Sequence, residues 1–213
     1  MDVLRTEEEQ IQALRDWWKE NGTSAVLGIA IGLAAVFGWR AWQAHQIERA
    51  EAASAVYQQL VNALRASESD KAGKTAAEIR QEYPDTVYAV FAGLIQAKLA
   101  VDASDLDAAA GHLRAALQKN RDPVLKWEIQ LRLARVLASQ AKYDEALALL
   151  DAASAGAYEA AYAELRGDIE ASRGNADAAR AAYERALPLL RSSGANAGML
   201  EAKLNALGPK PAA

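Results

Sequence analysis

The side chains best suited to acid–base chemistry are those of His45 and His112, together with carboxylates such as Asp168 and Glu170. The two histidines fall on different predicted segments, and no HExxH motif, glycine-rich phosphate loop or nucleophile elbow accompanies them. The chain has no cysteine, which excludes disulfides, thiolate chemistry and cysteine-ligated metals. The carboxylates are explained as a solvated helix face. The sequence therefore predicts no enzyme, no cofactor and no metal site.

Binding is the class of function that remains, and composition narrows both the fold and the partners. The chain is rich in alanine and has only five prolines among 213 residues, which favours helix because alanine loses least on entering one. We find no strand-like alternation and predict an all-α chain. A net charge of −4 gives no indication of a nucleic-acid-binding surface.

One segment is apolar enough to cross a membrane. The run from Asn21 to Trp39 holds no charged residue, and its length of about 28 Å matches the hydrocarbon core of a bilayer. Tryptophans flank it on both sides, as at membrane interfaces. We predict a transmembrane signal anchor at residues 23–43. The alternatives are a buried core helix or a cleaved signal peptide, but the N-terminal tail is acidic and the apolar core is too long for the latter.

The orientation follows from a small charge bias. Three basic residues precede the span and two follow it, which favours a cytoplasmic N-terminus and, in a bacterium, a periplasmic C-terminal domain. Within the span, Gly28 and Gly32 form a GxxxG pair, and Ala30 and Ala34 a second pair of small residues. Both are candidate surfaces for packing against another membrane helix.

Residues 1–22 are predicted to form a cytoplasmic amphipathic tail. Thr6 and Glu9 are spaced as a capping box, and apolar residues follow them in the sequence at helical spacing. Asn21-Gly22 is a candidate helix end. The tail either lies at the membrane interface or docks a cytosolic partner.

Behind the span, residues 44–208 are predicted to form a solenoid of tetratricopeptide-like repeats. Three stretches share one pattern: a helix with a small residue, a polar turn, and a second helix with small, large and small residues. Spacings near 34 residues match the tetratricopeptide period. The small residues are expected where antiparallel helices cross closely. In order of repeat, the positions are Ala97, Ala109, Leu113 and Ala116; Ala134, Ala146, Leu150 and Ala153; and Gly167, Ala179, Tyr183 and Ala186.

The flanks of the repeats are less regular. A helix at 47–64 either continues from the membrane or hinges near Ala44-His45, and a polar break at 67–74 precedes another helix at 75–83. A helix at 197–207 would cap the last repeat, and residues 209–213 would be a loose end.

The first helix of each repeat is expected to line a concave, protein-binding groove that suits an extended chain or a partner helix. By register, nine residues are the candidate contacts. They are Leu94, Lys98, Val101, Glu128, Leu131, Arg135, Ala138, Glu164 and Asp168.

The order of tail, apolar span and repeats resembles that of the YfgM family, the ancillary subunits of the bacterial Sec translocon. The resemblance covers nearly the whole chain. It is carried by ENG before the span, GWRAWQAHQ at its exit and AASAVYQQL behind it, and by the repeat stretches LRLARVLASQAKYDEALALLD and LRGDIEASRGNADAARAAYERAL.

This resemblance implies a bacterial inner-membrane protein with a periplasmic repeat domain. It implies association with the SecYEG channel and with a membrane-anchored periplasmic chaperone of the prolyl-isomerase type. Unfolded secreted or outer-membrane proteins would be the clients. Two other functions stay open: a scaffold that self-associates through the Gly28 and Gly32 face and the ends of the repeat array, and an anchor whose cytosolic tail binds a soluble regulator.

Overall fold

The computed structural model describes residues 7–150 and 156–208, and within these ranges the chain is helical with no strand. The predicted all-α fold is confirmed. The elements are α1 (Glu7–Arg65), α2 (Ser69–Glu82), α3 (Val87–Asp102), α4 (Leu106–Lys119), α5 (Pro123–Ser139), α6 (Tyr143–Leu149), the 3-10 turn η1 (Gly156–Tyr158), α7 (Glu159–Ser172), α8 (Ala176–Ser192) and α9 (Gly198–Ala206). Thr6, Ala153 and residues 209–213, on which parts of the prediction fell, lie outside the described residues.

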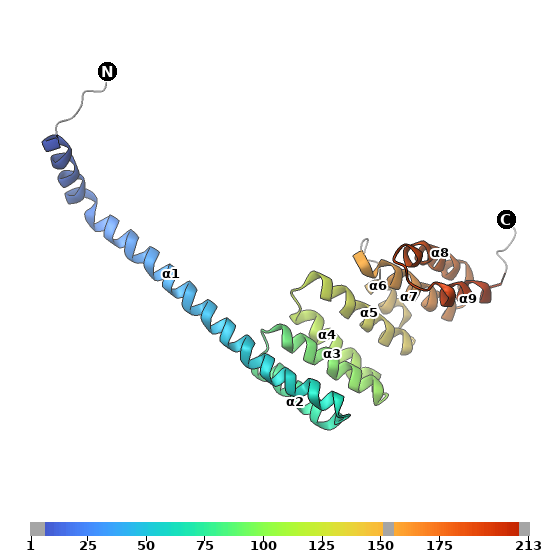
Figure 1. Cartoon of the computed structure of the whole chain (residues 1–213). Coiled ribbons are helices and arrows are strands. Elements are labelled where there is room, and N and C mark those ends of the chain that lie inside the picture. The colour runs from blue at the N-terminus through green and yellow to red at the C-terminus, as the bar shows by residue number, and fades with distance from the viewer. Residues whose placement is uncertain (1–6, 151–155, 209–213) are drawn as a thin grey trace, which may run out of the picture. The chain divides into compact units, whose positions relative to one another are not determined.

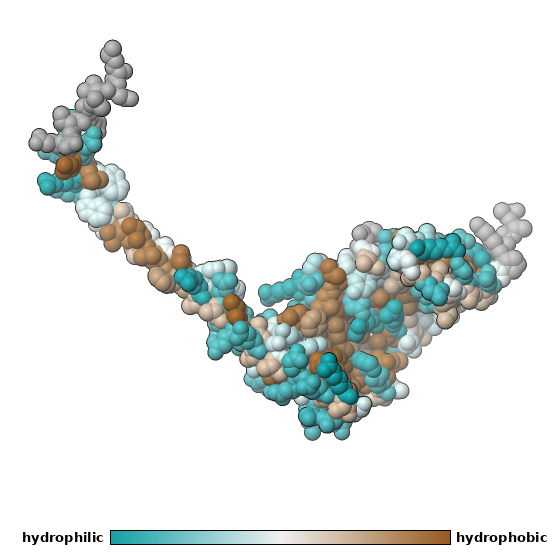
Figure 2. All heavy atoms as spheres, viewed as in Figure 1, coloured by the Kyte–Doolittle hydropathy of each residue, from teal (hydrophilic) through white to brown (hydrophobic). Residues whose placement is uncertain are grey.

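The chain divides into two units, residues 1–51 and 52–213. In the first, α1 contains the apolar stretch, and in the described part of the chain it is the one helix long and apolar enough to cross a membrane. The large apolar side chains from Val26 to Phe37 are all more than half exposed, and Figure 2 shows them as a largely brown stretch of α1. These side chains have no protein partner in this structure, which suits a lipid surround.

One expectation about α1 is wrong, since the helix does not end at Asn21-Gly22. At Ala44-His45 the structure has the continuous helix, one of the two predicted alternatives, and no hinge. The Asn21 amide donates to the carbonyl oxygen of Trp17 at 3.2 Å, within the helix, and Gly22 is covered by the Trp18 ring. A glycine inside a helix costs about 1 kcal/mol, which is too little to end this helix.

In the second unit, consecutive helices contact one another in chain order, as Figure 1 shows for α2 to α9. The turns between paired helices share one geometry. Ser67, Ser104, Ala141, Gly174 and Gly194 each have a φ between 57° and 79°. The next residue then donates its N–H to a carbonyl five residues back, the pattern of a Schellman helix end. A repeated turn of this kind gives each helix pair the same antiparallel arrangement.

The polar break predicted at residues 67–74 is also wrong in its length. The left-handed Ser67 reverses the chain at once, and α2 already begins at Ser69. This turn lies ahead of the three aligned repeats, so their register does not locate it. The end of α1 and α2 therefore form a helix pair ahead of the predicted repeats, with Leu60, Ala63, Ala76 and Ile79 buried between neighbours.

The predicted small positions lie in the core. Ala109, Ala134, Ala146 and Ala179 are completely buried, and the large positions Leu113, Leu150 and Tyr183 are buried beside them. Gly167 is buried as well, and a Cβ placed on it would overlap the Tyr183 ring. The third repeat thus has glycine and tyrosine at the two positions where the first two repeats have alanine and leucine. The predicted capping helix is confirmed as α9, whose Leu200 is buried against α7 and α8.

Candidate protein-docking surfaces on the repeat domain

Four of the predicted groove residues line one hollow of about 290 Å³ between α3 and α5. Leu94, Lys98 and Val101 reach it from α3, and Arg135 from α5. We refer to it as the α3–α5 hollow. Leu106 and Leu113 of α4 contribute to its lining, with Ala97, Arg132, Val136 and Ser139 completing it.

Helical periodicity places these side chains together. On α3 the lining residues recur every three or four positions, which is one face of a helix. The same holds on α5 for Arg132, Arg135, Val136 and Ser139. Asp122 begins α5 by accepting from the backbone N–H groups of Val124 and Leu125 at 2.7 and 3.0 Å. With Pro123 in the first turn, this cap sets where α5 starts and so which residues face α3.

The side chains around the hollow combine an apolar surface with positive charge. Leu94, Leu113 and Val136 belong to the buried core, whereas Val101 is 41% exposed. The Lys98 ammonium pairs with Asp102, and the Arg132 guanidinium pairs with Glu128, each four residues away on its own helix. Surface pairs at this spacing contribute about 0.3–0.5 kcal/mol, so they hold Lys98 and Arg132 only weakly.

Arg135 differs from its two neighbours. Its side chain makes no ion pair with any residue in 7–150 or 156–208. Its backbone carbonyl accepts from the Ser139 hydroxyl at 3.0 Å. The guanidinium therefore keeps all five N–H donors for solvent or for a partner.

The other predicted residues of α5 lie elsewhere. Leu131 is 3% exposed and belongs to the core, and Ala138 packs against that core. Glu128 is one partner in the Arg132 pair, outside the lining of the hollow. The face turned toward α3 is rotated by about one residue, or 100°, from the one we predicted. Arg132 and Ser139 were missed for this reason, although both are spaced three or four residues from Arg135 or Val136.

On α7, the predicted contacts Glu164 and Asp168 are held by the capping helix. The Lys203 ammonium lies 2.7 Å from Glu164 Oε1 and 2.8 Å from Asp168 Oδ1. The Tyr183 hydroxyl donates to Asp168 at 2.8 Å. We refer to this contact of α9 with α7 and α8 as the α7–α9 seam. The structure thus separates these two carboxylates from the α3–α5 hollow and gives them partners within the chain.

Burial and these contacts together shift the pKa values of Lys203 and Tyr183. Burial alone would lower the pKa of Lys203, but its hydrogen bonds to Asp168 and Glu164 more than offset burial and raise it. Burial raises the pKa of Tyr183, and its hydrogen bond to the Asp168 carboxylate raises it further. At neutral pH the seam therefore holds a charged lysine and a protonated tyrosine around two carboxylates.

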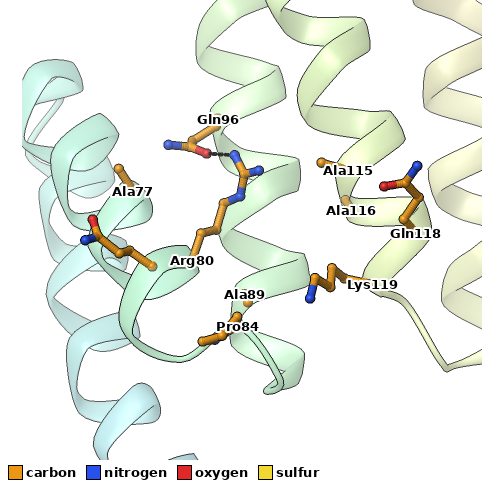
Figure 3. A pocket seen from close by; sticks show the side chains of 10 residues that line it. Ala77, Arg80, Pro84, Ala89, Gln96, Ala115, Ala116, Gln118 and Lys119 are labelled. Carbon is orange, nitrogen blue, oxygen red and sulfur yellow. Dashed lines mark hydrogen bonds between the residues drawn. The ribbon is translucent and has the colours of Figure 1, made fainter.

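A second hollow of about 300 Å³ lies against α2, α3 and α4 and has a more polar lining. Figure 3 shows the Arg80 side chain reaching from α2 to Gln96 on α3. The same guanidinium nitrogen lies 2.9 Å from His112 Nδ1 on α4. Burial lowers the pKa of His112, the Arg80 charge lowers it further, and Asp105 opposes both. A neutral ring accepts from Arg80, so this cluster links three helices.

No metal centre is indicated, since the described residues contain no group of three or more potential histidine or carboxylate ligands. In α1, a Cβ placed on Gly28 or Gly32 would meet nothing within 4 Å. No side chain of the described residues therefore covers the surface predicted for helix pairing.

Comparisons with known proteins agree with this architecture. A family model described as a tetratricopeptide repeat-like domain matches residues 15–209. A Haemophilus influenzae protein named as an ancillary SecYEG translocon subunit is 38% identical over 180 residues, covering 84% of this chain and 88% of that protein. An Escherichia coli protein of the same name is 35% identical over 187 residues, covering 86% and 88%. A third, from Aggregatibacter actinomycetemcomitans, is 33% identical over 198 residues and 93% of each chain.

Proposed function

The chain belongs to the tetratricopeptide repeat-like family of ancillary SecYEG translocon subunits, and from this membership we propose that it is a membrane-anchored, non-enzymatic adaptor at the Sec translocon. The observation that carries the proposal is the extent of the similarity. The family model matches residues 15–209, which include the apolar stretch of α1 and the repeats, and one named subunit aligns with 93% of the chain; this extent supports the proposal.

In this proposal, residues 23–43 cross the inner membrane, with residues 1–22 in the cytoplasm and 44–208 in the periplasm. The uncharged run, its flanking tryptophans and the exposure of its apolar side chains support the span. The orientation is supported by three basic residues before the span against two after it. The repeat domain would meet chains as they leave the channel.

The repeat domain supplies binding in this proposal. The α3–α5 hollow presents apolar and cationic side chains on consecutive first helices, the surface that helical-repeat proteins offer to extended segments or helices. The partners would be the SecYEG channel, a membrane-anchored periplasmic chaperone of the prolyl-isomerase type, and unfolded secreted or outer-membrane proteins. The bilayer lipid surrounds α1.

Recovery of the full chain from mild-detergent membranes, with partners identified by mass spectrometry, tests the adaptor proposal. We expect the Sec channel and a periplasmic chaperone to be recovered with it. Recovery of the chain alone would contradict the proposal. A deletion of residues 2–15 tests the regulator alternative, which requires that a cytosolic partner be lost.

The scaffold alternative is favoured by the open Gly28 and Gly32 face of α1. The double variant Gly28→Leu/Gly32→Leu should abolish self-association if this face pairs two copies. A second variant, Ala30→Leu/Ala34→Leu, tests the other predicted packing pair, which lies about 200° around the helix from the glycines. Loss of self-association in only one of the two variants would identify the face that pairs. If both variants retain the Sec channel, the membrane helix anchors the chain without selecting that partner.

A further inference from the structure

We propose that the α3–α5 hollow selects a partner segment that carries acidic side chains beside apolar ones. This inference rests on the adaptor function proposed above and specifies the chemistry of the segment bound at that site. The occupant is a protein segment, either extended or helical, with at least one carboxylate placed among aliphatic side chains.

The charges at the hollow support an acidic occupant. Its lining includes Lys98, Arg132 and Arg135, and among the described residues no aspartate or glutamate lines it. The chain as a whole has a net charge of −4, so this local excess of positive charge runs against the average of the sequence. Arginine forks bind carboxylates through two parallel hydrogen bonds, and Arg135 has its fork free.

The apolar part of the lining supports aliphatic side chains in the same segment. Leu94, Leu106, Leu113 and Val136 form a surface between the cations, and Val101 stands exposed at its edge. An exposed valine next to buried leucines offers area that a partner's aliphatic side chain would remove from water. The cations alone would bind any anion, and the apolar surface adds the preference for a mixed segment.

The α7–α9 seam supplies an internal comparison. Lys98, Arg135 and Asp168 occupy the same repeat position, at spacings of 37 and 33 residues. On α7 this position is acidic, and the chain covers it with Lys203 from α9. Between α3 and α5, both sides are basic and cannot neutralise each other. Lys98 and Arg132 are paired with carboxylates on their own helices, so Arg135 is the cation that a partner's acidic side chain would balance.

Binding of two fluorescent peptides to the full chain in lipid nanodiscs tests this inference. Both peptides have the same length and the same leucine and valine positions, with glutamate at the remaining positions of one and lysine in the other. We expect the glutamate peptide to bind and the lysine peptide not to bind. The double variant Arg132→Glu/Arg135→Glu should weaken binding of the glutamate peptide by about tenfold or more and should acquire binding of the lysine peptide.

The matched control is Arg121→Glu/Lys126→Glu, which changes the net charge equally on exposed residues outside the lining. It should leave the preference for the glutamate peptide unchanged. Lys98→Gln provides a milder second variant and should weaken the same binding a few-fold, with an unchanged circular dichroism spectrum. Equal binding of the two peptides, or equal effects of the two double variants, would overturn the inference.

The outcome is separable from that of the adaptor proposal. If the Sec channel is recovered with the chain but neither peptide binds, the adaptor role stands and the acidic preference is wrong. If adding more of the protein lowers the fraction of glutamate peptide that is bound, the occupant of the hollow is a second copy of the chain. That result would also overturn the assignment to a partner protein.

Discussion

The α3–α5 hollow and the α7–α9 seam are built from the same repeat position but carry opposite charges. Lys98 and Arg135 line the hollow, and Asp168 occupies the corresponding place on α7. In the seam, Lys203 covers the acidic position, and the Tyr183 hydroxyl donates to the same carboxylate. In the hollow, the cations are exposed and at most paired along their own helices.

This difference shows how one repeat pattern serves two purposes. At the α7–α9 seam, a lysine from the last helix meets two carboxylates of α7, and α9 covers the end of the solenoid. Where charges of the same sign meet, the surface stays open. The contrast depends on the packing beneath the seam, on the charges within it and on the turns between helices.

The largest effect is expected at Gly167, in the packing that supports the seam. A Cβ there would overlap the buried Tyr183 ring. Alanine is the better helix former by about 1 kcal/mol, but overpacking a core costs about 1–3 kcal/mol and two ring atoms are overlapped here. We expect Gly167→Ala to lower the free energy of unfolding by about 2 kcal/mol, measured by urea denaturation of the full chain in detergent.

The control for this prediction comes from the other repeats. Adding Tyr183→Leu to Gly167→Ala recreates the alanine–leucine pair found at Ala97 and Leu113. Most of the lost stability should return, less the contribution of the hydrogen bond to Asp168. If the double variant is no more stable than Gly167→Ala, steric overlap is not the cause.

A smaller effect is expected from the charge that closes the seam. Lys203→Met leaves Glu164 and Asp168 half-buried without their lysine, and should lower the free energy of unfolding by about 1 kcal/mol after allowance for solvent screening. Lys98→Met removes an exposed pair at the same repeat position as Asp168 and should cost at most about 0.5 kcal/mol. Equal losses in the two variants would remove the distinction between the closed and the open site.

The smallest effect is expected in the turns. Ala141 adopts a φ of 57°, whereas the third repeat uses Gly174 at this position. Because a left-handed conformation costs a residue with a Cβ about 1 kcal/mol, Ala141→Gly should raise the thermal midpoint slightly. Ala181→Gly, on the exposed side of α8, should lower it by a similar amount, because glycine weakens a helix interior. A loss of stability with Ala141→Gly would contradict the prediction.

Much of the fold could be predicted because packing imposes a period on the sequence. Close helix crossings require small residues, and Ala109, Ala134, Ala146 and Ala179 are buried where that period placed them. The three predicted turns contain Ser104, Ala141 and Gly174, each in the left-handed conformation. The turn at Ser67 was placed inside too long a break, because it lies ahead of the three repeats whose register located the other turns.

The candidate site was predictable only in part, because its composition depends on contacts between distant elements. The choice between Leu131 and Arg132 as the residue facing α3 depends on a rotation of α5 by one position, which periodicity alone does not fix. The partner of Asp168 is 35 residues away on α9. No local pattern indicates that Lys203 would cover a position that stays open on α5.

The most direct test of the account places a photo-crosslinking residue at Ser139 or at Ser172 in the full chain in native membranes. Both serines are exposed and occupy the same repeat position, but only Ser139 lines the α3–α5 hollow. We predict that Ser139 crosslinks to a Sec channel subunit, a periplasmic chaperone or a secreted chain, that Arg132→Glu/Arg135→Glu abolishes this product, and that Ser172 gives none. Equal products from both positions, or a product at Ser139 that survives the charge reversal, would contradict the account.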